Sequence, residues 1–211
     1  MSLAAGIAAG KVKGSVEAIE RDGEEIIAKH AANLPVELRR MQELLPGAVV
    51  EGRAKKLPSA MEKVVRKPHN YQTVSDLKDL TGMRVVAPTV DGVYKAVAAI
   101  KSRYKVVEDD DAIAQPKEGH YRSYHLTIIG DDKMPKEIQV RTPGQHVYAE
   151  WSHNVYKPLT REQEHLSRTR GPDLDAFSKR VSDYYYASET GKSAGEKPKC
   201  PPYIGKAFGC P

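Results

Sequence analysis

The stretch EIQVRT at Glu137–Thr142, followed by PGQHVYAEWSHNVYK at Pro143–Lys157, decides how the chain is expected to fold. Polar and apolar residues alternate through the first six positions, which predicts a strand with Ile138 and Val140 on one face. Its threonine suits a helix N-cap, and the proline after it suits the first helical position, where a missing N–H costs nothing. The stretch therefore predicts a strand that leads directly into a helix.

The polar face of this strand carries a carboxylate, an amide and a guanidinium, from Glu137, Gln139 and Arg141. The helix has a polar face and a neighbouring apolar stripe, because residues three and four apart lie on the same side. The polar face comprises His146, Glu150, His153 and Lys157, and the apolar stripe comprises Val147, Trp151 and Val155. An exposed edge strand with an amphipathic helix and a functional surface are both compatible with this pattern.

With 211 residues, 40% of them hydrophobic, the chain can bury one core, or a core with appendages. It has no run of about 20 apolar residues that spans a membrane, and its N-terminus lacks the basic segment of a signal peptide. Its net charge of +5 suits anionic ligands such as nucleotides or RNA. Cys200 and Cys210 lack partners at zinc-finger spacing, so free thiols in a cytosolic chain or a disulfide in an exported one are expected.

Turn residues and hydrophobic periodicity divide the chain into four parts. They predict an N-terminal helical segment over 1–47, a core over 48–160, a C-terminal helix over 161–190 and a flexible tail over 191–211. Residues 1–12 are expected to fray, and Pro35 is expected to separate two helices. Strand patterns occur at residues 48–51, 83–87, 104–107, 121–129 and 137–141. The predicted fold class is α/β (α+β), a mixed sheet of about five strands flanked by helices.

Two acidic residues, Asp79 and Glu137, each begin a predicted β segment. Carboxylates on neighbouring strands suit Mg²⁺, which takes oxygen ligands and completes its shell with water and phosphates. An acidic residue at a strand start is also commonly solvated, so neither carboxylate alone indicates a metal site.

A basic loop that runs into a helix precedes these carboxylates. Its pattern, Arg-x-Lys-x-x-x-Ser-x-x-x-Lys-x-x-Arg, is formed by Arg53, Lys55, Ser59, Lys63 and Arg66. A helix start near the serine would bring cations and backbone N–H groups to one point, as a polyphosphate requires. The segment lacks the glycines of a Walker loop, and a solvated basic helix is the alternative.

The segment HYRSYH at His120–His125 is a third unusual feature. In an extended strand, Tyr121, Ser123 and His125 share one face. Tyr121 can stack on one base, and the guanidinium of Arg84 can stack on another. Tyrosine also favours strands in general, so ordinary strand composition is the alternative.

Together these segments resemble the synthetase domain of the RelA/SpoT family, the alarmone pyrophosphokinases, from about Glu51 to Lys157. Five ordered motifs carry the resemblance: the basic signature, Asp79-x-x-Gly82-x-Arg84, Lys117 with HYRSYH, EIQVRT, and Ala149 with His153 and Tyr156-Lys157. The resemblance implies a nucleotidyltransferase-like fold and an enzyme that transfers the β,γ-pyrophosphate of ATP to the 3′-hydroxyl of a purine nucleotide. The family as a whole implies GDP or GTP as the acceptor, giving (p)ppGpp.

The resemblance also implies roles for individual residues. Those implied to bind ATP are Arg53, Lys55, Ser59, Lys63, Arg66 and Arg84, with Arg84 stacked on adenine. Asp79 and Glu137 are implied to be catalytic and to bind the cofactor Mg²⁺, with Glu137 also polarising the acceptor hydroxyl. Those implied to bind the acceptor are Lys117, Tyr121, Arg122, Ser123, His125, Gln139, Arg141, Ala149 and His153, with Tyr121 stacked on its base.

The sequence departs from the family at His120, where glycine is usual, and in a shorter spacing between His153 and Tyr156. Both departures fall where the acceptor is expected, so adenosine nucleotides and the 3′ end of tRNA remain alternative acceptors. No His-Asp doublet is present, so the hydrolase activity of bifunctional members is not expected. No motif lies beyond Lys157, so removal of the residues after Ala187 is expected to spare the chemistry.

A small stand-alone synthetase and a toxin of the same family both agree with this pattern. The toxin would have an antitoxin or immunity protein as partner. The synthetase and the toxin would each act in the cytoplasm, and neither is expected to bind a membrane. Two other classes explain only part of the sequence. A zinc hydrolase would use His146, Glu150 and His153 but leaves the basic segment without a role. An RNA-binding module would use the basic charge and the tyrosines but has no need of the two carboxylates.

Overall fold

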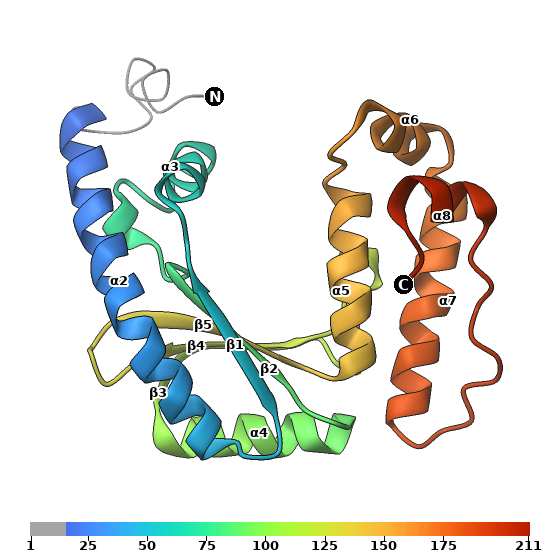
Figure 1. The fold of residues 1–211 in the computed structure, drawn as a ribbon, viewed down its shortest axis with the longest axis horizontal. Coiled ribbons are helices and arrows are strands. Elements are labelled where there is room, and N and C mark those ends of the chain that lie inside the picture. The colour runs from blue at the N-terminus through green and yellow to red at the C-terminus, as the bar shows by residue number, and fades with distance from the viewer. Residues whose placement is uncertain (1–15) are drawn as a thin grey trace. The chain divides into compact units, whose positions relative to one another are not determined.

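The computed structural model describes residues 16–211, so the fraying expected at residues 1–12 lies outside the described part. The described chain contains a five-stranded mixed sheet in the order β1-β2-β5-β4-β3, together with helices (Figure 1), and the predicted α+β class is confirmed. The strands are β1 Val49–Ala54, β2 Thr81–Val86, β3 Lys105–Asp111, β4 Tyr124–Ile129 and β5 Pro135–Arg141. The helices are α2 Val16–Leu44, α3 Leu57–Arg66, η1 Val74–Asp76, α4 Val90–Arg103, η2 Glu118–His120, α5 Pro143–Tyr156, α6 Arg161–Thr169, α7 Gly171–Glu189 and α8 Pro202–Phe208, of which η1 and η2 are 3₁₀ helices.

The chain divides into two compact units. The first comprises the residues up to Arg84, Ile100–Asp109 and Leu126–Gln139, and the second comprises Val85–Ala99, Asp110–His125 and Val140–Pro211. The units interleave along the chain, because strands distant in sequence pair in one sheet. Within residues 16–211, no helix has the length and apolar character needed to cross a membrane.

In the first unit, α2 lies along β1 (Figure 1) and buries Ile19, His30 and Met41. Pro35 lies inside this helix, so the predicted break between two helices is wrong. A proline within a helix removes one backbone hydrogen bond and costs about 3 kcal/mol. The helix continues because residues on both sides of Pro35 pack within the same unit, and such packing overrides local propensity.

Gly52 of β1 lets α2 approach the sheet closely. A Cβ atom at this position would lie 2.8 Å from Leu38 Cδ2, 3.1 Å from Leu34 Cδ1 and 3.1 Å from the Gly82 carbonyl oxygen. The backbone of β2 cannot move aside without disturbing the sheet, so any side chain here would push α2 away. The residues on either side of Gly52 face the opposite side of β1, because side chains alternate along a strand.

Gly52→Ala is expected to lower the free energy of unfolding by about 1–3 kcal/mol, because overpacking forces the helix or the strand to shift. Gly47→Ala is the matched control, since nothing lies within 4 Å of a Cβ atom at Gly47. The control is expected to be neutral or slightly stabilising. Urea unfolding of both variants checks the prediction, and equal effects would contradict the close approach.

The core of the first unit anchors the chain on either side of the acidic residue Asp79. One cluster of buried side chains comes from α2, α3, η1 and the segment before β2, and comprises Ile19, Ala60, Val64, Val65, Val74, Leu77 and Leu80. The backbone N–H of Lys55 donates to the Leu80 carbonyl at 2.7 Å, which ties the end of β1 to this segment. Asp79 therefore has a fixed place beside the end of β1.

In the second unit, α5 begins as predicted, with Thr142 as N-cap. The Gln145 N–H donates to the Thr142 hydroxyl at 3.3 Å, and the Thr142 N–H donates to the Gln145 side chain at 3.1 Å, forming a capping box. The apolar stripe differs from the prediction at one position, since Val147 is 44% exposed whereas Tyr148 is 2% exposed. Tyr148 packs in a cluster with residues of α7, which decides the buried face of α5.

The C-terminal residues differ from the flexible tail predicted over 191–211. Cys200 and Cys210 form a disulfide that encloses α8. Ile204 and Phe208 of α8 are buried in the same apolar cluster as residues of α5 and α7. The proline- and glycine-rich composition suggested mobility because it does not reveal that two apolar side chains find partners in the unit.

Candidate active site

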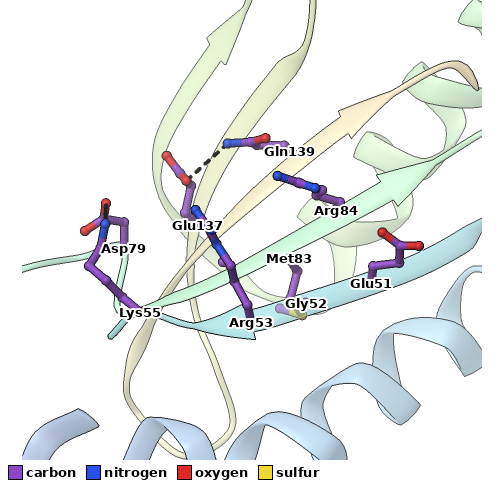
Figure 2. A pocket seen from close by; sticks show the side chains of 10 residues that line it. Glu51, Gly52, Arg53, Lys55, Asp79, Met83, Arg84, Glu137 and Gln139 are labelled. Atoms are coloured by element: carbon purple, nitrogen blue, oxygen red, sulfur yellow. Dashed lines mark hydrogen bonds and ion pairs between the residues drawn. The ribbon is translucent and has the colours of Figure 1, made fainter. Parts of the chain in front are cut away.

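Three strands of the first unit surround a pocket, which we term the first pocket (Figure 2). Its lining residues are Glu51, Gly52, Arg53, Lys55, Asp79, Gly82, Met83, Arg84, Glu137 and Gln139. In Figure 2, Arg53 and Arg84 extend from β1 and β2 toward Glu137 and Gln139 on β5. Six residues that the sequence predicted as site residues therefore lie around one space.

The alternation of β5 explains why Glu137 and Gln139 reach this pocket. Ile138 and Val140 are fully buried on the other face, as the sequence predicts. The Gln139 Nε2 donates to Glu137 Oε2 at 3.3 Å, which orients the carboxylate.

Asp79 lies between two lysines. Its Oδ2 is 2.7 Å from Lys63 Nζ and 2.9 Å from Lys55 Nζ. Burial opposes ionisation of the Asp79 carboxyl, but hydrogen bonds from Lys63 and Lys55 outweigh burial and lower its pKa below the ordinary value. Asp79 is therefore an anion at neutral pH, in a region of concentrated positive charge.

The other carboxylate oxygen of Asp79 bears on metal binding. Asp79 Oδ1 is buried and accepts no hydrogen bond from the residues that the structure describes. A buried oxygen without a donor is costly unless a cation or a ligand satisfies it. Mg²⁺ takes oxygen ligands and is commonly held by one or two carboxylates together with phosphates. Asp79 and Glu137, which line the same pocket, fit such an ion.

A second pocket in the first unit shares both carboxylates with the first. Its lining residues are Lys63, Asn70, Tyr71, Asp76, Lys78, Asp79, Glu108, Thr127 and Glu137. The Lys63 Nζ lies 5.4 Å from the centre of the Tyr71 ring. Asp79 and Glu137 therefore have access to two adjoining spaces, each with basic side chains.

Helix α3 begins where the basic signature predicts. It starts at Leu57, so Ser59 is its third residue, and Lys63 and Arg66 follow on the same face. Lys63 reaches the second pocket, whereas Ser59 and Arg66 are exposed and line neither pocket. Their predicted contact with ATP phosphates stays a prediction.

The predicted acceptor residues of the second unit fall into different environments. Strand β4 begins at Tyr124, so Tyr121 precedes the strand instead of lying in it. The Tyr121 hydroxyl lies 3.1 Å from His125 Nε2, and the two rings meet edge to face. Both side chains are partly exposed, as stacking on a ligand requires.

Three predicted acceptor residues are buried in the second unit. Arg122 is 5% exposed and its guanidinium donates to protein groups, so it does not face a ligand as predicted. Ser123 is fully buried and donates to the Val140 carbonyl at 3.3 Å. Arg141 is 1% exposed, with its Nη2 2.8 Å from His146 Nδ1. Burial of Arg141 breaks the predicted alternation at the last residue of β5, since it packs against α5.

The remaining predicted acceptor residues are Lys117, Ala149 and His153. Lys117 pairs with Asp110, Ala149 is 8% exposed on α5, and His153 is exposed near the end of the same helix. Within residues 16–211 no three His, Cys, Asp or Glu side chains are grouped to hold a metal, and this includes His146, Glu150 and His153 of the alternative zinc site.

The backbone before Tyr121 is left-handed at two successive residues. Gly119 has φ 72° and His120 has φ 57°. A left-handed conformation costs a non-glycine residue about 1–2 kcal/mol. The conformation also explains why glycine, which pays no such cost, suits this position.

Sequence reasoning missed several residues of the second pocket, including Tyr71, Lys78, Glu108 and Thr127. Lys78 pairs with Glu108 at 2.7 Å, and Thr127 donates to the other oxygen of Glu108 at 2.8 Å. These residues come from separate parts of the chain, and no spacing in the sequence indicates that they meet.

The sequence of this chain matches a known protein family. The family described as "Region found in RelA / SpoT proteins" matches residues 52–160. The "Bifunctional (p)ppGpp synthase/hydrolase RelA" of Mycobacterium tuberculosis is 35% identical over 106 residues, 49% of this chain and 14% of that protein. The "GTP pyrophosphokinase rsh" of Brucella ovis is 32% identical over 152 residues, 70% of this chain and 18% of that protein. The chain thus spans less than a fifth of the length of these relatives.

The fold has similar solved structures. The small alarmone synthetase 1 of Bacillus subtilis, bound to its product pppGpp, matches with a TM-score of 0.60 and 24% sequence identity. The match covers 77% of this chain and 89% of the other. At this identity the likeness concerns the fold.

Proposed function

This chain belongs to the family defined by the region found in RelA and SpoT proteins, and on that premise we propose that it is an ATP-dependent pyrophosphokinase. It transfers the β,γ-pyrophosphate of ATP to the 3′-hydroxyl of a purine nucleotide, with GDP or GTP as the principal acceptor. The product is then (p)ppGpp, and the site of action is the cytoplasm, where these nucleotides are found.

The observation that carries this proposal is the pair of carboxylates, Asp79 and Glu137, shared by two adjoining pockets with basic walls. Transfer of a pyrophosphoryl group requires cations around the phosphates and a group that orients the attacking hydroxyl. An RNA-binding surface requires the cations alone. The carboxylates therefore favour the enzyme over the binding module.

We assign the base of ATP to the first pocket and its phosphates to the lysines beside Asp79. The Arg53 and Arg84 guanidiniums line the first pocket, and planar guanidiniums stack well on aromatic rings. Lys55 and Lys63 converge on one oxygen of Asp79 and carry the charge that phosphates need.

Asp79 and Glu137 are the proposed Mg²⁺ ligands in this assignment. When bound there, Mg²⁺ would neutralise negative charge on the phosphate oxygens. Glu137 also accepts a hydrogen bond from the acceptor 3′-hydroxyl, and Gln139 holds Glu137 in the orientation that this bond needs. The role of Tyr121 is to stack on the acceptor base, a contact worth about 1–3 kcal/mol.

An acceptor panel tests the function. The purified chain is incubated with Mg²⁺, ATP labelled in the γ-phosphate, and each of GDP, GTP, ADP, ATP and deacylated tRNA. We expect label on GDP and GTP above all other acceptors. Label on adenosine nucleotides or tRNA would keep the chemistry and change the acceptor, and label on none would contradict the function.

The two substrates are expected to respond to different substitutions. Tyr121→Ala is expected to raise the KM for the acceptor roughly tenfold to a hundredfold, because one stacked base loses its partner. Arg53→Ala and Lys63→Ala are expected to raise the KM for ATP instead. Steady-state kinetics with each substrate varied in turn checks this division.

A matched control is Lys29→Ala, which removes an exposed cation that pairs with Glu25 on α2. It is expected to change neither KM. A Tyr121 variant with a defect for ATP alone would contradict the assignment of Tyr121 to the acceptor.

A further inference from the structure

Hydroxyl groups hold the left-handed turn that leads into Tyr121. The Tyr148 hydroxyl of α5 donates to the Gly119 carbonyl at 2.6 Å, and the Ser182 hydroxyl of α7 donates to the His120 carbonyl at 2.6 Å. Gly119, Tyr148 and Ser182 are all buried, and His120 is partly buried, which limits the access of water to these bonds. The two carbonyls belong to the two residues with positive φ, so each bond stabilises an unfavourable backbone conformation.

Arg122 fixes the other side of Tyr121. Its Nε donates to the oxygen of the Ser182 hydroxyl at 3.1 Å, and its Nη2 donates to Asp183 Oδ1 at 2.8 Å. The guanidinium lies 4.4 Å from the centre of the Tyr186 ring, also on α7. Its Nη1 donates to the carbonyls of two loop residues, Ile113 at 2.6 Å and Ala114 at 3.0 Å.

The Ser182 hydroxyl is the centre of this arrangement, because one oxygen serves both neighbours of Tyr121. It donates to the carbonyl of His120 and accepts from the side chain of Arg122. Ser182 is 2% exposed, so its hydroxyl has no role toward solvent. Helix α7 lies outside residues 52–160, to which the family description applies.

We infer that Ser182 of α7 is a positioning residue for the acceptor nucleotide: its hydroxyl sets the backbone on both sides of Tyr121 and so presents the tyrosine ring to the acceptor base. Arg122 is its partner in this role, which replaces the direct acceptor contact predicted from sequence. The inference rests on the proposed function, because it concerns the substrate that Tyr121 stacks on. It gives α7 a task in selecting the acceptor.

Ser182→Ala removes the hydroxyl and leaves the helix intact, since alanine is a strong helix former. We expect the KM for GDP to rise roughly fivefold to twentyfold, because two hydrogen bonds that hold the turn are lost. The KM for ATP is expected to stay within about twofold of its original value. Hydrogen exchange of the amides in residues 117–122 is expected to accelerate in the same variant.

Two further variants separate positioning from general stability. Ser182→Thr keeps a hydroxyl at the position, and we expect it to retain the slow exchange and most of the affinity for GDP. Ser167→Ala is the matched control, because its hydroxyl donates to the Val155 carbonyl at 3.3 Å in the same unit and not to a residue of the turn. It is expected to alter neither the exchange of residues 117–122 nor the KM for GDP.

The inference is overturned if Ser182→Ala leaves the KM for GDP and the exchange of the turn unchanged. It is also overturned if the KM for ATP and the KM for GDP rise by the same factor, because a general structural defect would produce that result. Failure of the proposed function looks different, since the unsubstituted chain would then transfer no pyrophosphate to any acceptor. Hydrogen exchange needs no turnover, so it still decides whether Ser182 holds the turn.

Discussion

Asp79→Asn is expected to lower the rate of pyrophosphate transfer by roughly two to three orders of magnitude or more, while the chain remains folded. The substitution keeps the shape of the side chain and removes the negative charge between Lys55 and Lys63. It also replaces one of the two carboxylates that fit Mg²⁺. Glu137→Gln is expected to cause a similar loss, because an amide is a much weaker base than a carboxylate toward the proton of the 3′-hydroxyl on the acceptor nucleotide.

Asp131→Asn is the matched control for this experiment. Asp131 also lies between two cations of the first unit, Arg40 at 3.2 Å and Arg103 at 2.7 Å, but lines neither pocket. The Asp131→Asn variant is expected to transfer pyrophosphate at the rate of the unsubstituted chain. Steady-state rates are compared after circular dichroism has shown that each variant is folded. Near-normal activity of Asp79→Asn or Glu137→Gln would show that the site has been assigned wrongly.

Truncation after Ala187 is expected to destabilise the second unit by about 4 kcal/mol or more, which differs from the expectation, made from the sequence, that the chemistry would be spared. It removes α8, whose Ile204 and Phe208 are buried, and such side chains contribute about 1.5–3 kcal/mol each. It also removes the bond from Trp151 Nε1 to the Gly209 carbonyl at 2.9 Å. Total stabilities of proteins are about 5–15 kcal/mol, so this loss affects folding and transfer.

The same truncation removes Glu189, which holds the start of α5. Glu189 accepts a hydrogen bond from the Thr142 hydroxyl and another from the Gly144 N–H at 2.6 Å. Burial raises the pKa of the Glu189 carboxyl, and these two bonds oppose the rise. Loss of bonds to a charged group costs about 1.5–3 kcal/mol. The start of α5 therefore depends on a residue 45 positions beyond Gly144.

A second truncation after Thr190 separates the two effects, because it removes α8 and keeps Glu189. Its thermal unfolding temperature is expected to lie between that of the full chain and that of the chain that ends at Ala187. Transfer activity is measured at a temperature where all three are folded. Equal stability of the three chains would contradict the role of the C-terminal residues.

Local signals were sufficient where a residue's role depends on its neighbours in sequence. The alternation of β5 correctly predicted that Glu137 and Gln139 share a face, and the Thr142–Pro143 pair correctly predicted the start of α5. The basic signature predicted a helix near Ser59 for the same reason. These features follow from periodicity and capping, which require no knowledge of the tertiary fold.

Tertiary contacts decided the features that the sequence did not reveal. Pro35 is tolerated inside α2 because the helix packs along β1. Arg122 is of a residue type that commonly binds anionic ligands. Its guanidinium N–H groups instead donate to Ser182 and Asp183, sixty or more positions away. The second pocket assembles Lys63, Glu108 and other residues from distant segments. Such pairings depend on topology, which a single sequence does not specify.

The most direct test of the proposed activity is to determine whether ATP is converted to AMP or to ADP during the reaction. The purified chain is incubated with Mg²⁺, ATP and GDP, and the products are separated and quantified by mass spectrometry and ³¹P NMR. A pyrophosphokinase releases AMP mole for mole with a guanine nucleotide that carries two additional phosphates on its 3′-oxygen, and this is the result we predict. Release of ADP with a singly phosphorylated product, or loss of ATP without a modified acceptor, would contradict the account.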